Sequence, residues 1–194
     1  MITVAVPRIE LLERAIAPTA RIVSGVTEDR WASPSPCEDM TGLGLVEHLV
    51  GGLDQFAAVG AGQPFDQIAT ERSFTATDAP NEYRAAGDRM LAVWSEPGVV
   101  DRNYAMPWGD TAGSDLVGFM IIEQLTHGWD LAKATGQEPD YDDDLAEATL
   151  QLARGYDDAT IRVPGMFDAI VPIADDSAAI DRLAAFLGRR PDEW

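Results

Sequence analysis

The chain has 194 residues, of which 46% are hydrophobic, and a formal net charge of −19 at neutral pH. This length is typical of one domain, which we expect to span residues 1–194, and the hydrophobic content suffices for a substantial core. The negative charge argues against nucleic acid or an anionic membrane as a partner. No apolar run has the length of a membrane span, no N-terminal signal pattern is evident, and the single cysteine suits a reducing compartment, so we expect a cytoplasmic protein.

Apolar residues at three- and four-residue spacing predict four helices in the first two thirds of the chain. These helices run from Pro7 to about Val23, from about Thr41 to Gly60, from Pro80 to Trp94, and from Ser114 to about Gly136. A kink or break is expected at Pro18, since proline has no backbone N–H to donate. Thr41 or Asp39 should cap the second helix and Ser114 the fourth. Four such helices, over residues of about 5–137, predict an all-α bundle.

The segments between these helices are predicted to be irregular, over residues 27–40, 61–79 and 98–113. Trp108, in the last of them, is the tryptophan best placed to line the mouth of a pocket.

A C-terminal extension of about 138–194 should add short helices. One is expected to start at the acidic run 142–144 and continue through Tyr156, and another to run from a Ser177 cap through Leu187, with residues 160–175 as a loop or short strand. The acidic run complements a helix dipole and lacks the glycine and the terminal glutamate of a calcium-binding EF-hand loop.

Two histidines and a glutamate form the candidate site. Glu123 and His127 are four residues apart, so they differ by about 40° around the helix and share one face. His48, the other of the two histidines in the chain, lies on the second predicted helix. If the two helices pack together, these side chains form the ligand set of an open divalent metal site. Alternatively, either histidine could be a hydrogen-bonded residue of the core.

Four further residues have open alternatives. Asp130, three residues after His127, could orient an imidazole N–H or lie on the surface near the helix end. Cys37 precedes a helix start, where a thiolate is stabilised, but a lone cysteine without a neighbouring base is more often structural. Arg189 and Arg190 could bind a substrate carboxylate, although a solvated helix end is the simpler interpretation.

Three segments of the sequence resemble the DinB/YfiT-like metalloenzymes. They read WASPSPC at 31–37, HLVGG at 48–52 and EQLTHGWDLAKATGQ at 123–137. The resemblance is to the actinobacterial branch that is similar to the N-terminal domain of mycothiol-dependent maleylpyruvate isomerase. The closing DRLAAFLGRRP at 181–191 resembles the tail of small single-domain members of this group.

This resemblance implies an up-down-down-up four-helix bundle that holds a divalent metal, often zinc or nickel. The ligand positions match His48, Glu123 and His127, and an acidic residue beside the site matches Asp130, which becomes the candidate catalytic residue. The resemblance also implies a low-molecular-weight thiol, such as mycothiol, as cosubstrate. The arginine–aspartate pair that the family usually has between the positions of Cys37 and His48 is absent, which bears on the substrate more than on the metal.

Two neutral imidazoles and one carboxylate would leave a divalent ion with a net charge of about +1 and an open position. Such an ion deprotonates a coordinated thiol. The sequence therefore predicts a metal-dependent enzyme that uses a small thiol for transfer, isomerisation or detoxification of a small electrophile. The alternative is a non-catalytic metal- or ligand-binding bundle with a structural or sensing role. A homodimer would fit either function, because relatives often form dimers and an apolar bundle face could support one.

Overall fold

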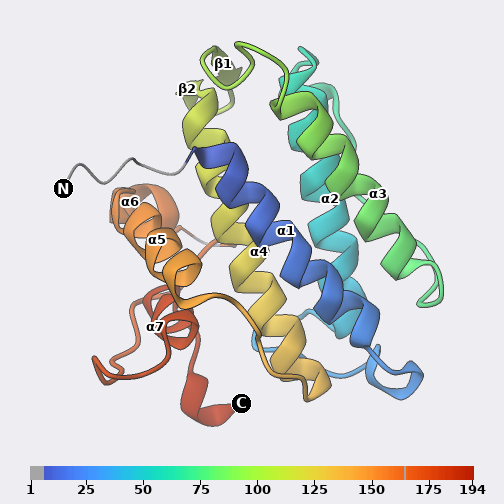
Figure 1. Ribbon diagram of the computed structural model, residues 1–194, viewed down its shortest axis with the longest axis vertical. Helices are drawn as coiled ribbons and strands as arrows, with labels where there is room; N and C mark the ends of the chain where they lie inside the picture. The colour runs from blue at the N-terminus through green and yellow to red at the C-terminus, as the bar shows by residue number, and fades with distance from the viewer. Residues whose placement is uncertain (1–6, 164) are drawn as a thin grey trace.

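The computed structural model describes residues 7–163 and 165–194, and it shows a bundle of four long helices with shorter helices packed beside it (Figure 1). The long helices are α1 (Arg8–Gly25), α2 (Gly42–Gly60), α3 (Ala79–Trp94) and α4 (Gly113–Thr135). This confirms the predicted all-α bundle, although its expected start near residue 5 lies outside the described residues.

The four helices run in the up-down-down-up order that the resemblance implies (Figure 1). α1 and α4 are parallel, because Arg8 at the start of α1 lies 3.7 Å from Asp115 at the start of α4, and the Thr19 hydroxyl donates to the Gln124 carbonyl further along. α2 and α3 are also parallel to each other, since the Trp94 indole at the end of α3 donates to the Phe56 carbonyl near the end of α2. The long connection over residues 61–78 returns along the bundle and allows this arrangement.

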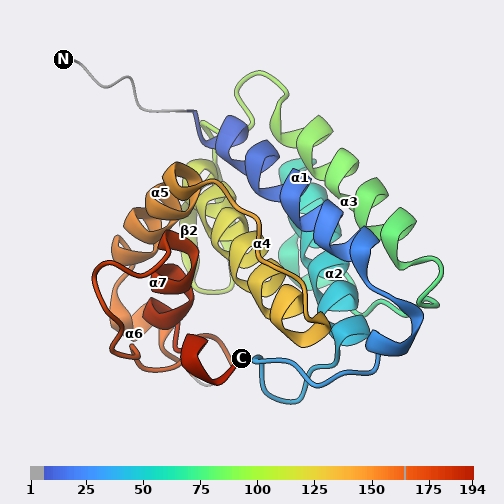
Figure 2. The ribbon, with the colours of Figure 1, turned by 60° about the horizontal axis from the view of Figure 1, so that its bottom comes forward.

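α4 is the central element of the structure. It lies between α1 and α2 on one side and the C-terminal helices on the other (Figure 2), so most of its residues are buried. A helix that is enclosed all round has to be apolar or to satisfy its polar groups internally. α4 does both, because its buried face combines Leu125 and Trp129 with His127 and Asp130.

The C-terminal extension forms α5 (Asp143–Arg154), α6 (Asp158–Ile161) and α7 (Ala179–Phe186), followed by a short 3₁₀ turn. α5 and α7 pack against each other and against α4, and the Trp129 indole of α4 donates to Asp181 of α7 at 2.7 Å. The acidic run opens α5 as predicted, and the Arg14 guanidinium of α1 binds Asp144 at 2.8 Å.

The structure corrects several local predictions. Residues 98–113 are not wholly irregular, because β1 (Asn103–Met106) and β2 (Gly109–Ala112) form an antiparallel hairpin whose two-residue turn contains Trp108. Gly109, with a φ of +118°, supplies the backbone conformation that this tight turn requires. α6 lies partly in the stretch predicted to be loop or strand, and α5 ends two residues before Tyr156.

Helix boundaries also differ from the predictions. α1 continues through Pro18 without a break, because the proline is buried and packing holds the helix on both sides of it. Thr41, not Asp39, caps α2 by accepting from the Gly44 N–H. Ser114 and Ser177 do not cap their helices, whose N-caps are Ala112 and Ala178.

None of the helices in the described part of the chain combines the length and the apolar character needed to cross a bilayer.

Substitutions at Thr41 and at Ser114 give a paired test of the assigned starts of α2 and α4. Thr41→Ala should lower the free energy of unfolding by about 1 kcal/mol, because a free N–H of α2 loses its acceptor. Ser114→Ala should change it by less than about 0.5 kcal/mol, since Ser114 lies inside α4 and caps nothing. Urea unfolding followed by circular dichroism measures both, and equal losses for the two variants would contradict the assigned helix starts.

Candidate metal centre

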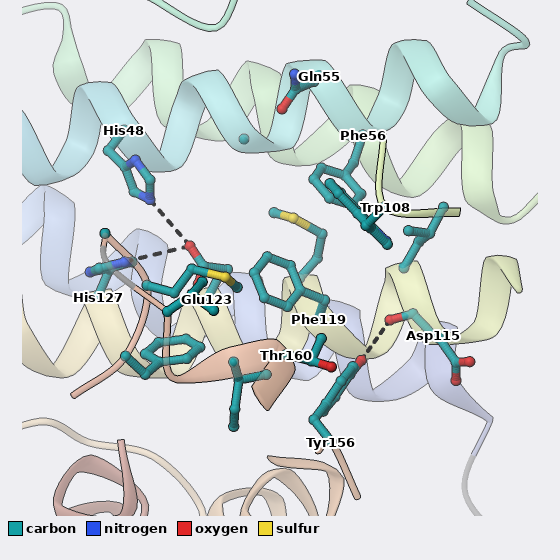
Figure 3. Close-up of a pocket in the computed structure, with 18 of the residues that line it drawn as sticks. His48, Gln55, Phe56, Trp108, Asp115, Phe119, Glu123, His127, Tyr156 and Thr160 are labelled. Carbon is teal, nitrogen blue, oxygen red and sulfur yellow. Dashed lines mark hydrogen bonds and ion pairs between the residues drawn. The ribbon is translucent and has the colours of Figure 1, made fainter. Parts of the chain in front are cut away.

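Three potential ligand atoms converge between α2 and α4. His48 projects from α2, while Glu123 and His127 project from successive turns of α4 (Figure 3). His48 Nε2 lies 3.1 Å from Glu123 Oε2, and His127 Nε2 lies 3.5 Å from the same oxygen. All three ligand atoms lie within 4.8 Å of one another. The helix packing on which the predicted ligand set depended is therefore present.

Gly51 and Gly52, which follow His48 on α2, differ in how closely other elements approach them. A Cβ at Gly52 would stand 3.6 Å from the Met120 side chain of α4, and a Cβ at Gly51 would overlap the Thr70 carbonyl of the loop that crosses α2. A larger residue at Gly51 would therefore push the 61–78 connection away from α2.

Burial and charge set the protonation states of the buried pair. Burial raises the pKa of Glu123, but the neighbouring His127 and His48 lower it by more, so its pKa lies well below the ordinary range. Burial lowers the pKa of His127, but Glu123 and Asp130 raise it by more, to about 9. Without a metal, the folded chain therefore holds a carboxylate and an imidazolium side by side at neutral pH.

Asp130 is fully buried directly behind His127. Its Oδ2 accepts from His127 Nδ1 at 3.0 Å, and the Arg189 guanidinium donates to both carboxylate oxygens, from Nη2 at 2.8 Å and from Nε at 3.1 Å. Burial raises the pKa of Asp130, but the hydrogen bonds and charges of His127 and Arg189 outweigh it and lower the pKa. Asp130 is therefore not a surface carboxylate near the helix end, which was the other interpretation of its position in the sequence.

Arg189 differs most from its predicted setting. It was expected at a solvated helix end, but only 6% of its side chain is exposed, and it also donates to the Leu187 carbonyl. The neighbouring Arg190 is exposed as expected. Asp130 and Arg189 are 59 positions apart, and the sequence has no pattern that connects them.

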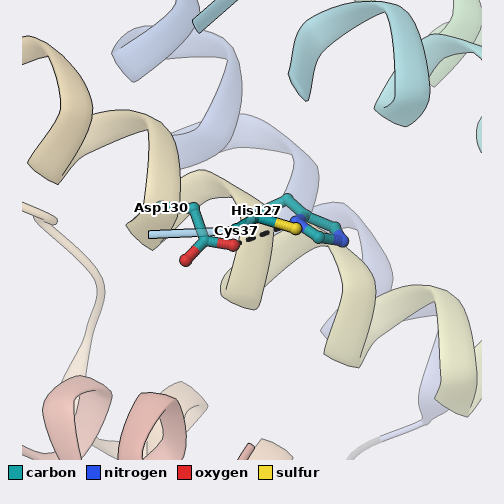
Figure 4. Close-up of side chains that lie close together, drawn as sticks. All are labelled: Cys37, His127 and Asp130. Atoms are coloured by element: carbon teal, nitrogen blue, oxygen red, sulfur yellow. Dashed lines mark hydrogen bonds and ion pairs between the residues drawn. The ribbon is translucent and has the colours of Figure 1, made fainter. Parts of the chain in front are cut away.

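Cys37, His127 and Asp130 form a second group of potential ligands within 4.8 Å of one another (Figure 4). This group is a poor cation site, because both Asp130 oxygens already accept from the Arg189 guanidinium, whose positive charge repels a metal. Burial also raises the pKa of the Cys37 thiol to about 11, so the thiol stays protonated and is no nucleophile. Both features favour a structural Cys37.

A cavity of about 680 Å³ opens from the candidate metal centre. His48, Glu123 and His127 lie at one end, and the cavity continues between α2, α4 and the segment 156–167 (Figure 3). Trp108 lines it, as predicted for this residue. Further polar residues line the cavity, and none of them was predicted from the sequence. They are Gln55, Thr111, Asp115, Tyr156 and Thr160.

The sequence is similar to a known protein family and to two mycobacterial proteins. The sequence model described as the mycothiol maleylpyruvate isomerase N-terminal domain matches residues 12–132. Uncharacterised proteins of two Mycobacterium tuberculosis strains are 33% identical over 178 residues, which is 91% of this chain and 94% of theirs.

Solved structures show the same fold. A DinB-like protein of Bacillus subtilis matches with a TM-score of 0.56 at 16% identity, over 66% of this chain and 90% of that chain. Mycothiol-dependent maleylpyruvate isomerase matches with a TM-score of 0.55 at 14% identity, over 74% of this chain and 66% of its own. At such identities the structures establish the fold, while residues 133–194 lie beyond the family match.

The raised pKa of His127 can be measured directly. In the presence of a chelator, one of the two imidazole signals in the proton NMR spectrum should titrate with a midpoint of about 9, against an ordinary value of 6.5. The signal is assigned to His127 if it is absent from the spectrum of the His127→Gln variant. Because the folded pKa is raised, the stabilisation by this group is complete below about 6.5 and is lost as pH rises through about 9. A midpoint near 6.5 in the folded protein would contradict the buried ion pair.

The Asp130–Arg189 pair predicts a non-additive loss of stability. Arg189→Met should cost about 3–5 kcal/mol, because it leaves Asp130 ionised and buried with one partner fewer. Asp130→Asn together with Arg189→Met should cost less than the sum of the single changes, since both charges leave at once. Urea unfolding measures all variants, and the exposed Arg190→Met is the matched control with little expected effect. If the loss of unfolding free energy in the double variant equalled the sum of the two single losses, this would argue against the pairing of Asp130 with Arg189.

Proposed function

Since this chain belongs to the mycothiol maleylpyruvate isomerase N-terminal domain family, we propose that it is a divalent-metal-dependent enzyme that uses a low-molecular-weight thiol on a small electrophile. The thiol is mycothiol or a similar compound, and the chemistry is transfer or isomerisation, in a detoxifying role. The observation that carries this proposal is the convergence of His48 Nε2, Glu123 Oε2 and His127 Nε2 at one end of a cavity.

The donor set fits a divalent ion such as zinc or nickel. It offers two imidazole nitrogens and one carboxylate oxygen from two rigid helices, which leaves room for an exogenous ligand on the cavity side. The Nε2 atoms of both imidazoles lie 3.1 and 3.5 Å from one Glu123 oxygen, and protons and metals compete for these same nitrogen atoms. When bound, the ion would supply Lewis-acid chemistry by lowering the pKa of a thiol that joins it.

Asp130 contributes through His127 in this proposal. It has no exposed surface and does not line the cavity, so it is a positioning residue that does not touch the substrate. By accepting from His127 Nδ1, it would leave Nε2 as the nitrogen that faces His48 and Glu123. Arg189 holds Asp130 in its ionised form.

The cavity is large enough for a small-molecule substrate. Its volume of about 680 Å³ is within the range of sites that enclose a drug-sized ligand. Apolar side chains from α2, α4 and the segment 156–167 form most of its wall and would keep water from the reacting atoms.

Metal binding is the first test. Isothermal titration with zinc or nickel should show about one ion per chain, and His48→Ala should remove most of this binding because a ligand is lost. Asp130→Asn should weaken binding by about 10- to 100-fold, since His127 loses its orienting acceptor. Cys37→Ser is the matched control and should bind like the wild type. Equal loss in Cys37→Ser would assign the ion to the second ligand group.

Thiol chemistry is the second test. Conjugation of mycothiol, or of a simpler thiol, to a panel of electrophiles should be lost with a chelator and restored by zinc or nickel. His48→Ala should abolish it, and Cys37→Ser should retain it. Turnover that does not depend on the metal would remove the proposed mechanism. Tight metal binding without any thiol turnover would support the alternative of a non-catalytic metal-binding bundle.

A further inference from the structure

We infer that the electrophile is an uncharged, lipophilic molecule with an elongated or aromatic apolar body, and not an organic anion. This inference rests on the proposed function, because it names the substrate class for the same site. It is carried by the charges and the shape of the cavity.

No arginine or lysine is among the residues that line the cavity in the described part of the chain. The ionisable residues there are Glu123 and the two histidines of the candidate metal centre, together with Asp115, whose carboxylate lies 3.7 Å from Arg8. A buried carboxylate on a substrate would need a cationic partner to offset its loss of hydration. The lining provides none beyond the metal centre.

The guanidinium groups around the cavity are already engaged. Arg189 is held by Asp130, and Arg8 lies 3.7 Å from Asp115. Arg162 binds Asp158 at 2.9 Å and also donates to the carbonyls of Asp168 and Phe186. Recruiting any of them to a substrate would break an existing ion pair.

The metal centre offers little charge to an acidic substrate. A divalent ion beside Glu123 would keep a net charge of about +1, and the proposed thiol in its anionic form matches that charge. The electrophile would then meet a neutral site at this end and, at the other, Asp115, whose charge is opposed by Arg8.

The cavity instead presents a mostly apolar surface. It follows α4 from Glu123 past Met120 and Phe119 to Asp115, a rise of about 12 Å (Figure 3). Four side chains from different elements form an aromatic cluster along it: Phe56, Phe65, Trp108 and Phe119. Phe56 stacks on Phe119 with ring centroids 6.2 Å apart, and Phe65 meets Trp108 edge-on at 5.4 Å.

The opposite wall comes from the C-terminal extension, which lies beyond the family match. It includes Ile161, Val163, Met166 and Phe167. Val163 and Met166, like Trp108 with 60% of its surface exposed, are large apolar residues that remain accessible to solvent. Exposed apolar residues around a cavity are typical of sites that take up apolar ligands.

Displacement of a neutral fluorophore tests this inference by equilibrium binding. N-phenyl-1-naphthylamine should gain emission on entering the aromatic cluster. Decanol should then displace it at concentrations at least about 10-fold lower than decanoate, which has the same chain length and is ionised near neutral pH. The titrations are run on the wild-type protein with a chelator and again after loading with zinc. Equal or better displacement by decanoate in both forms would overturn the inference.

A charge added to the wall should reverse the preference. Thr160→Arg places a guanidinium in the lining and should improve displacement by decanoate about 10-fold without improving that by decanol. Ala174→Arg is the matched control, since Ala174 is exposed and does not line the cavity. An equal gain in both variants would mean that net charge, not the lining, governs selectivity, and this would count against the inference.

Failure of this inference and failure of the proposed function give different results. Wild-type protein that prefers decanol but binds no zinc would keep the apolar site and remove the metal-dependent function. Protein that binds zinc at the three ligands but prefers decanoate would keep the function and remove the lipophilic substrate.

Discussion

The burial of ionised groups on α4 constrains the elements that pack around this helix. Glu123, His127 and Asp130 project from one enclosed helix, and an isolated charge there would cost several kcal/mol. Each charge is therefore matched: Glu123 by two imidazoles and Asp130 by His127 and Arg189. A divalent ion in place of the histidine proton would leave a net charge of about +1 at this site, which an anionic ligand would balance.

This constraint ties the C-terminal extension to the bundle. The Arg189 guanidinium reaches Asp130 only because α7 packs beside α4, where the Trp129–Asp181 hydrogen bond also holds it. The family match ends at residue 132, yet the residue that neutralises Asp130 lies beyond it. The extension is thus part of the site in a physical sense, since it supplies a buried counter-charge as well as one wall of the cavity.

The pairing of charged side chains also affects the character of the cavity. Arg8, Arg162 and Arg189 each lie beside a carboxylate, and most of the residues that line the cavity are aromatic or aliphatic. The fold is shared with mycothiol-dependent maleylpyruvate isomerase, whose name refers to an organic anion. A shared fold does not fix the substrate, because function resides in side chains and loops carried by a common scaffold.

The four long helices and the pairing of Glu123 with His127 were predictable from the sequence, because both follow from helical periodicity. His48 was predictable as the third member, because it is the other of the two histidines in the chain and has glycines nearby. The burial of Asp130 and its pairing with Arg189, which was expected in solvent, became evident from the folded structure. The same holds for the hairpin at Trp108 and for the cavity wall from the extension. The Asp130–Arg189 pair and the cavity wall depend on contacts between residues far apart in the chain, and no local pattern of spacing or propensity encodes the energies of these contacts.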